Sequence, residues 1–111
     1  MTTKVNFDES EQRDLLSAAV RLYESGLYGL CMSILDLLMS CKNKEAYVLA
    51  GHCIADSEYQ SSKPLSRQYY EVACDLGSAV GCYNLHLSYT NDDQIMADSY
   101  LERAKLLGWT D

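Results

Sequence analysis

An internal repeat in the second half of the chain is the feature that most constrains its fold. Tyr-Glu-Val-Ala-Cys-Asp-Leu-Gly at residues 70–77 matches Leu-Glu-Arg-Ala-Lys-Leu-Leu-Gly at residues 101–108. The two segments share Glu, Ala, Leu and Gly at the same places, and the offset of 31 residues (101 − 70) is typical of helix-pair repeats. We expect Ala73 and Ala104 to be small because neighbouring helices approach closely there. The repeat therefore predicts a stack of similar helical units.

Apolar residues at helical spacing divide the rest of the chain in the same way. Asp8 with Glu11 has the form of a capping box, Pro64 suits the first turn of a helix, and residues 91–93 offer a further cap. Gly26, Gly77 and Gly108 are expected to end helices, since glycine readily adopts a left-handed conformation at that position. The expected helices cover about residues 8–24, 28–39, 44–58, 64–76, 79–89 and 94–107. The expected fold class is all-α, with about six helices in three antiparallel pairs.

Residues 82–89, Cys-Tyr-Asn-Leu-His-Leu-Ser-Tyr, resemble the first helix of a tetratricopeptide (TPR) or Sel1-like repeat, whose usual form is Tyr-Asn-Leu-Gly-x-x-Tyr. Ala97, Leu101 and Ala104 match the second helix of such a repeat. Further matches in the middle repeat are Tyr47, Ala50, Gly51, Ile54, Ser66, Tyr70 and Ala73, and those in the first repeat are Leu15, Ala18, Ala19, Leu22, Gly26, Tyr28, Cys31, Leu35 and Leu38. The longer middle loop and the Ala-x-x-Leu-Gly endings favour the Sel1-like form.

The resemblance covers about residues 12–108 and implies one domain, residues 1–111, with repeats at about 12–45, 46–78 and 79–108. The chain departs from the family pattern at three positions. His86 stands at a usual Gly, and Cys31 and Leu38 stand at usual Ala positions. These departures bear on how tightly the helices pack, and a helical bundle without repeats remains the alternative.

The resemblance also implies an α-solenoid in which the first helix of each pair lines a concave, partner-binding face. Matched position by position, that face would consist of Arg13, Leu16, Val20, Tyr23, Glu45, Val48, His52, Ala55, Tyr83, Leu87 and Thr90. An apolar and aromatic surface of this kind suits an amphipathic helix or an extended peptide. A clamp for a terminal carboxylate is not expected, because only Arg13 in this set is basic. Alternatively, Leu16, Val20, Val48 and Leu87 pack together as core.

The charge balance limits the choice of partner. Sixteen acidic residues outnumber nine basic ones, which gives a net charge of −7. Such a chain is repelled by nucleic-acid phosphates and by anionic membranes, so neither is an expected partner. The charge favours encounter with a basic protein, or it serves only solubility. The function we expect is a non-catalytic protein–protein interaction module, an adaptor or small scaffold. The alternative is an immunity protein or antitoxin that inhibits a basic effector such as a nuclease toxin.

Catalytic and metal-binding patterns are weak. Cys82 and His86 are four residues apart on one expected helix face, a spacing that can hold zinc or form a nucleophilic pair. No convergent further ligand, orienting acid or phosphate-binding glycine loop accompanies them. Packing against the partner helix is therefore the favoured interpretation, and we expect no enzyme, metal or cofactor.

Five cysteines, Cys31, Cys41, Cys53, Cys74 and Cys82, show no Cys-x-x-Cys spacing. They are expected to be small buried residues, and a disulfide framework is not expected. Residues 1–11 lack the apolar stretch of a secretory signal, and no apolar run approaches the roughly 20 residues of a membrane helix. A cytoplasmic location is the default expectation. Leu107 and Trp109 near the end of the chain either cover the last helix or form an apolar edge through which two copies associate. A monomer or weak homodimer is therefore expected.

Overall fold

The computed structural model describes residues 6–57 and 62–110, and these residues form six α-helices without any strand. The helices are α1 (Glu9–Glu24), α2 (Tyr28–Ser40), α3 (Lys44–Asp56), α4 (Lys63–Asp75), α5 (Ala79–Tyr89) and α6 (Gln94–Leu106). The expected all-α fold class and the number of helices are confirmed. Within the described parts of the chain, no helix has the length and apolar character needed to cross a membrane.

Local capping explains where most of the helices begin. The Asp8 carboxylate accepts from the Glu11 backbone N–H at 2.8 Å, and the Glu11 carboxylate accepts from the Asp8 N–H at 3.0 Å. This reciprocal pair is the expected capping box. Capping side chains also stand before α3, α4, α5 and α6; they belong to Asn43, Ser62, Ser78 and Asp93. Each satisfies a backbone donor that the first helical turn leaves without an intrahelical partner.

Glycines in the left-handed region follow three of the helices, as the sequence predicts. Gly26, Gly77 and Gly108 have φ angles of 76°, 96° and 104°. The turn at Gly77 is the most consequential, because it reverses the chain between α4 and α5. There the Gly77 N–H donates to the Cys74 carbonyl at 3.0 Å, and the Ser78 N–H donates to the Ala73 carbonyl at 2.9 Å.

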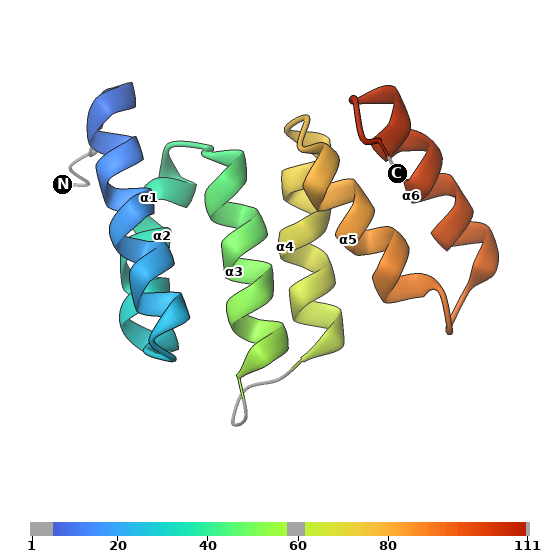
Figure 1. Ribbon diagram of the computed structural model, residues 1–111, viewed down its shortest axis with the longest axis horizontal. Coiled ribbons are helices and arrows are strands. Elements are labelled where there is room, and N and C mark those ends of the chain that lie inside the picture. Colours follow the sequence, from blue (N-terminus) through green and yellow to red (C-terminus); the bar gives the residue numbers. More distant parts are fainter. Residues whose placement is uncertain (1–5, 58–61, 111) are drawn as a thin grey trace, which may run out of the picture.

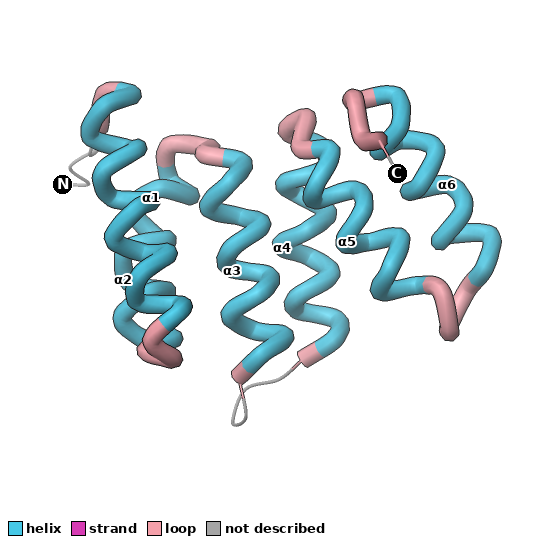
Figure 2. The backbone as a smooth tube through the Cα atoms, in the orientation of Figure 1, coloured by secondary structure: helices cyan, strands magenta, loops and turns pink. Residues whose placement is uncertain are grey.

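The helices follow one another along the long axis of the molecule, and the two ends of the chain lie at opposite sides (Figures 1 and 2). Helix α1 packs against α2, α3 against α4, and α5 against α6, while α2–α3 and α4–α5 contacts join these units. Two buried clusters form the core, one from α1 to α3 and one from α3 to α6. Contacts of α3 with both α1 and α5 bring these three helices to one side of the molecule.

The expected close approach at Ala73 is found between α4 and α5. Ala73 is fully buried, and Gly81 of α5 stands against it. A Cβ atom on Gly81 would lie 2.8 Å from the Ala73 Cβ and 3.0 Å from the Cys74 backbone nitrogen. Small residues at both positions therefore let the two helix backbones come together.

Two helix boundaries in the middle of the chain differ from expectation. Helix α3 ends at Asp56, earlier than the expected residue 58, and α4 begins at Lys63 with Ser62 as its cap. Pro64 lies in the first turn of α4, as expected. Residues 58–61, which include most of the expected loop, lie outside the described residues.

No disulfide framework was expected from the five cysteines, but two of them form a disulfide. Cys74 at the end of α4 is bonded to Cys82 at the start of α5, and their Cα atoms are 4.7 Å apart. The turn at Gly77 and the close packing at Gly81 create this proximity, which a spacing of eight residues does not reveal. Cys31 and Cys53 are buried as expected, whereas Cys41 is only partly buried.

Candidate functional site

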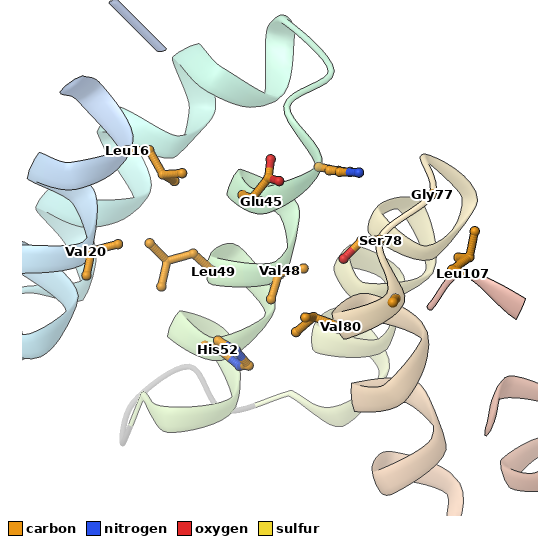
Figure 3. A pocket seen from close by; sticks show the side chains of 12 residues that line it. Leu16, Val20, Glu45, Val48, Leu49, His52, Gly77, Ser78, Val80 and Leu107 are labelled. Atoms are coloured by element: carbon orange, nitrogen blue, oxygen red, sulfur yellow. The ribbon is translucent and has the colours of Figure 1, made fainter. Parts of the chain in front are cut away.

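A groove of about 410 Å³ runs between α1, α3 and the start of α5. Its apolar lining comes from Leu16, Val20, Val48, Leu49, Val80 and Leu107. Lys44, Glu45 and His52 add polar groups along α3, and the α4–α5 turn closes one side. Figure 3 shows side chains from α1, α3 and α5 turned toward the same hollow. The groove is thus a mainly apolar surface assembled from three helices that are distant in sequence.

Helical periodicity explains why these side chains share one surface. Leu16 and Val20 are four residues apart and lie on one face of α1. On α3, Glu45 and Leu49 are also four apart, and His52 follows three residues later. One stripe from each helix therefore faces the groove. Leu107, which follows the last helix, comes from a different part of the fold and completes the far wall.

The structure brings together five of the eleven residues expected on the partner-binding face. Leu16, Val20, Glu45, Val48 and His52 all line the groove. Leu16 and Val20 also rest against the buried cluster of α1 to α3, and Val48 belongs to the other buried cluster. The alternative of core packing thus applies in part to these three residues.

The expected residues on α5 lie elsewhere. Tyr83 is covered by Trp109, whose ring stacks on it with centroids 4.0 Å apart and an interplanar angle of 16°. Leu87 is 49% exposed, so it is not the core residue that the alternative required. It lines a separate cavity of about 330 Å³, together with Ala55 at the end of α3. The Thr90 hydroxyl donates to the Leu87 carbonyl at 2.8 Å at the end of α5.

The two remaining expected residues are on α1. Tyr23 donates a hydrogen bond from its hydroxyl to the Asp56 carboxylate on α3. This bond and the nearby carboxylate charge, together with burial, raise the Tyr23 pKa, so the hydroxyl keeps its proton. Arg13 is exposed at the beginning of the helix and does not line the groove. Tyr23 therefore ties α1 to α3, the two helices that form the groove walls.

Several groove residues were absent from the expected set. Leu49 follows Glu45 by four residues, and Val80 precedes Tyr83 by three, so helical periodicity offered a signal for both. Lys44 is the first residue of α3, and the direction in which its side chain points depends on the turn before the helix. The positions of Gly77, Ser78, Ala79 and Leu107 depend on how the turns after α4 and α6 fold. Periodicity within a helix does not give those positions.

His52 is the titratable group on the groove floor whose environment is most distinctive. Its Nδ1 lies 2.7 Å from the Tyr70 hydroxyl, and the Tyr70 and Tyr23 rings pack beside it. Burial lowers the His52 pKa, and the Asp56 charge opposes this effect in part. Burial raises the pKa of Tyr70, so its hydroxyl keeps a proton to donate to a neutral His52. The groove floor therefore carries an uncharged imidazole at neutral pH.

The zinc interpretation of Cys82 and His86 conflicts with their surroundings. The Cys82 sulfur is bonded to Cys74, and His86 Nδ1 lies 2.9 Å from the Ala97 carbonyl on α6. Both side chains thus serve contacts between helices, as the packing interpretation expects. Across residues 6–57 and 62–110, no cluster of three or more His, Cys, Asp or Glu side chains is arranged to hold a metal ion.

Comparisons with known proteins give no family assignment: no protein-family model, curated protein or solved structure matches this chain.

Proposed function

We propose that this chain is a TPR/Sel1-like solenoid of three antiparallel helix pairs that binds an amphipathic helix of another protein in the groove between α1, α3 and α5. The internal match between residues 70–77 and 101–108 supports the repeat. The contacts of α1 with α2, α3 with α4, and α5 with α6 agree with paired helices. The groove lies on the first helices of these pairs, which is the surface that the resemblance implies for binding.

The observation that carries the proposal is the incomplete burial of apolar groups at the groove. Val80 and Leu107 each leave 44% of their surface exposed, and both line the mainly apolar groove. Covering such side chains releases water, and full burial of a Val or Leu is worth about 1.5–3 kcal/mol. Apolar anchors on one face of a helical ligand would cover both residues at once.

Charge supports a basic ligand. The chain carries a net charge of −7, whereas the groove floor is mostly apolar, with Lys44 and Glu45 at one end. An amphipathic helix with basic residues flanking its apolar face would bury the apolar side while its net positive charge is attracted by the net negative charge of this chain. Complementary charge of this kind speeds association more than it tightens the complex.

Two matched pairs of variants test the groove. Val80→Glu and Leu107→Glu place a carboxylate in it, while Val72→Glu and Leu76→Glu place one on similarly exposed residues outside it. Leu76 and Leu107 are the C-cap residues of α4 and α6 and occupy equivalent repeat positions. Proteins captured from the native host would be identified by mass spectrometry, and the dissociation constant of a purified candidate would be measured for each variant.

The proposal expects a partner that wild type and both control variants bind with similar affinity, while the groove variants bind at least about tenfold more weakly. Circular dichroism would establish that all four variants remain helical. A partner that binds Val80→Glu and Leu107→Glu as tightly as wild type would rule out the groove as its site.

A second candidate function is inhibition of a basic effector, as in an immunity protein or antitoxin. The net charge of −7 on a chain of 111 residues favours it. A gene for a basic toxin directly beside the gene for this chain would support this function. Association with that toxin should then slow steeply as the salt concentration rises, because steering between opposite charges is screened. An on-rate that does not change with salt would speak against it.

A further inference from the structure

Two buried thiols face each other across the contact between α2 and α3. Cys31 is 0% exposed and Cys53 is 1% exposed, and their Sγ atoms are 3.4 Å apart. The Cys31 thiol also donates to the Ala19 carbonyl on α1 at 3.2 Å. A disulfide needs sulfurs about 2.05 Å apart, so they would have to approach by about 1.4 Å. Side-chain rotation and a small shift of two packed helices can supply that movement.

A cavity gives this pair a route to small molecules. It has a volume of about 330 Å³ and lies between the α1–α2 turn and the end of α3, where Cys53 forms part of its wall. Gly26 and Gly29 leave that side open, with no atom near the place where a Cβ would stand. Cys53 is therefore the sulfur that a small reagent in the cavity would meet first.

We propose that Cys31 and Cys53 are a site of reversible disulfide formation, driven by a small dialkyl disulfide that enters through this cavity. The Cys53 thiolate attacks one sulfur of the reagent and expels the first alkyl thiolate. The Cys31 thiolate then attacks the Cys53 sulfur, forms the Cys31–Cys53 bond and expels the second thiolate. Two protein thiols lose two protons and two electrons, and the reagent is reduced to two thiols.

The new bond would complete a pattern already present in the chain. Cys74–Cys82 joins α4 to α5, and Cys31–Cys53 would join α2 to α3. These are the two most extensive contacts between the three helix units. The oxidised chain would thus be covalently linked at both junctions, including the one beneath the groove walls α1 and α3.

Burial sets the pH at which this reaction proceeds. It raises the pKa of the Cys31 thiol and raises that of Cys53 to about 12. The thiolate is the attacking form, so little of it is present at neutral pH. Well below the thiol pKa, the initial rate should rise about tenfold for each pH unit.

The test treats the purified full chain with bis(2-hydroxyethyl) disulfide at about pH 9 and then alkylates it under denaturing conditions. Peptide mapping should recover a Cys31–Cys53 cross-link in which neither sulfur is alkylated or carries an alkylthio group from the reagent. The treated protein should melt about 5–10 °C higher than the untreated protein, because the bond closes a loop with a separation of 22 residues.

Cysteine variants test whether the thiols that disappear on treatment are those of Cys31 and Cys53. Cys53→Ala and Cys31→Ala should each abolish the cross-link, whereas Cys41→Ser should leave it intact. The wild-type peptide map decides the matter even if a variant folds poorly. Recovery of Cys31 and Cys53 both fully alkylated after prolonged treatment would overturn the proposal, as would their cross-linking to other cysteines instead of to each other.

Discussion

The ring of Tyr70 lies against the backbone of Gly51, where α4 crosses α3. A Cβ atom on Gly51 would stand 2.4 Å from Cε1 and 2.8 Å from Cζ of that ring. Tyr70 is 6% exposed, and its hydroxyl is bound to His52, so the ring has little freedom to move aside. The absence of a side chain at Gly51 therefore lets the ring fill the contact between the two helices.

Gly51→Ala should lower the free energy of unfolding by about 1–3 kcal/mol, because the added methyl group overpacks this contact. This loss should exceed the gain that alanine normally brings to a helix. Gly29→Ala in α2 is the control, since the added Cβ would meet nothing within 4 Å apart from its own helix backbone and chain neighbours. That variant should be more stable than wild type by about 0.4–1 kcal/mol. Urea unfolding measures both, and a Gly51→Ala variant as stable as Gly29→Ala would contradict the overpacking argument.

Arg67 holds the end of α5 to α4 through several contacts. Its guanidinium lies 3.8 Å from the centroid of the Tyr89 ring, and its nitrogens donate to the Ser88 hydroxyl at 2.8 Å and the Ser88 carbonyl at 2.6 Å. It also pairs with Asp92 at 2.6 Å. Arg67→Ala should destabilise the chain by about 1–3 kcal/mol, because the hydrogen bonds and the ring contact are lost together.

Lys63 provides the matched control for Arg67. It pairs with the same Asp92 carboxylate at 3.0 Å, but its side chain is 55% exposed. Lys63→Ala should lower the free energy of unfolding by less than about 0.5 kcal/mol, since an exposed ion pair is screened by water and salt. Chemical unfolding in low and high salt separates the two residues. Equal losses for both variants would mean that the ion pairs with Asp92, and not the contacts to Ser88 and Tyr89, carry the effect of Arg67.

The helices could be predicted from the sequence because local interactions set their ends. Asp8 and Glu11 form the expected cap, and Gly26, Gly77 and Gly108 adopt the expected left-handed turns. These signals act between residues a few positions apart, so the sequence contains them directly. Helix α3 ends earlier than expected, at Asp56, because apolar periodicity shows which face is buried and not where the last hydrogen-bonded turn lies.

The groove could be predicted only as far as helix faces determine it. Leu16, Val20 and Val48 follow from periodicity and from the family resemblance. The positions of Leu107 and Trp109 do not, because Leu107 is the C-cap residue of α6 and Trp109 follows the turn at Gly108, so neither lies within a helix. The disulfide escaped prediction for a similar reason: a turn between two helices, and not a sequence motif, brings its sulfurs together.

The protonation of His52 should make stability depend on pH. Burial lowers its folded-state pKa below the ordinary value of about 6.5 that applies to the unfolded chain. The unfolded state therefore binds more protons in this range, and stability rises with pH. The stabilising effect of neutral His52 is fully present above about pH 6.5 and is lost as the pH falls through that value toward the folded-state pKa.

Comparison with His52→Gln isolates this contribution from other titrating groups. The free energy of unfolding of wild type should fall relative to that of the variant as the pH is lowered from about 7.5 to about 5. Nearby Asp56 should moderate the effect, since its charge favours the protonated imidazole. Urea unfolding at several pH values measures the difference. A difference between the two proteins that stays constant over this range would exclude a lowered His52 pKa.

Trp109 covers Tyr83 by ring stacking. The two ring centroids are 4.0 Å apart, while the buried Trp109 Nε1 lacks a hydrogen-bond partner among the described residues. Trp109→Ala should lower the free energy of unfolding by about 2–4 kcal/mol, because it removes the stacked ring and uncovers Tyr83. Trp109→Phe should lower the free energy of unfolding by less than about 1 kcal/mol, since it keeps an aromatic ring and removes a buried donor that is no longer hydrated.

The contrast between these two variants separates stacking from hydrogen bonding at the end of the chain. Thermal unfolding followed by circular dichroism can measure it. If Trp109→Phe is as damaging as Trp109→Ala, the indole N–H contributes to stability and must be hydrated or bonded in solution. If Trp109→Phe retains most of the stability, the ring itself holds the end of the chain over Tyr83. That residue would then be covered by its own chain and unavailable to a partner, which leaves Val80 as the exposed apolar contact on α5 at the groove.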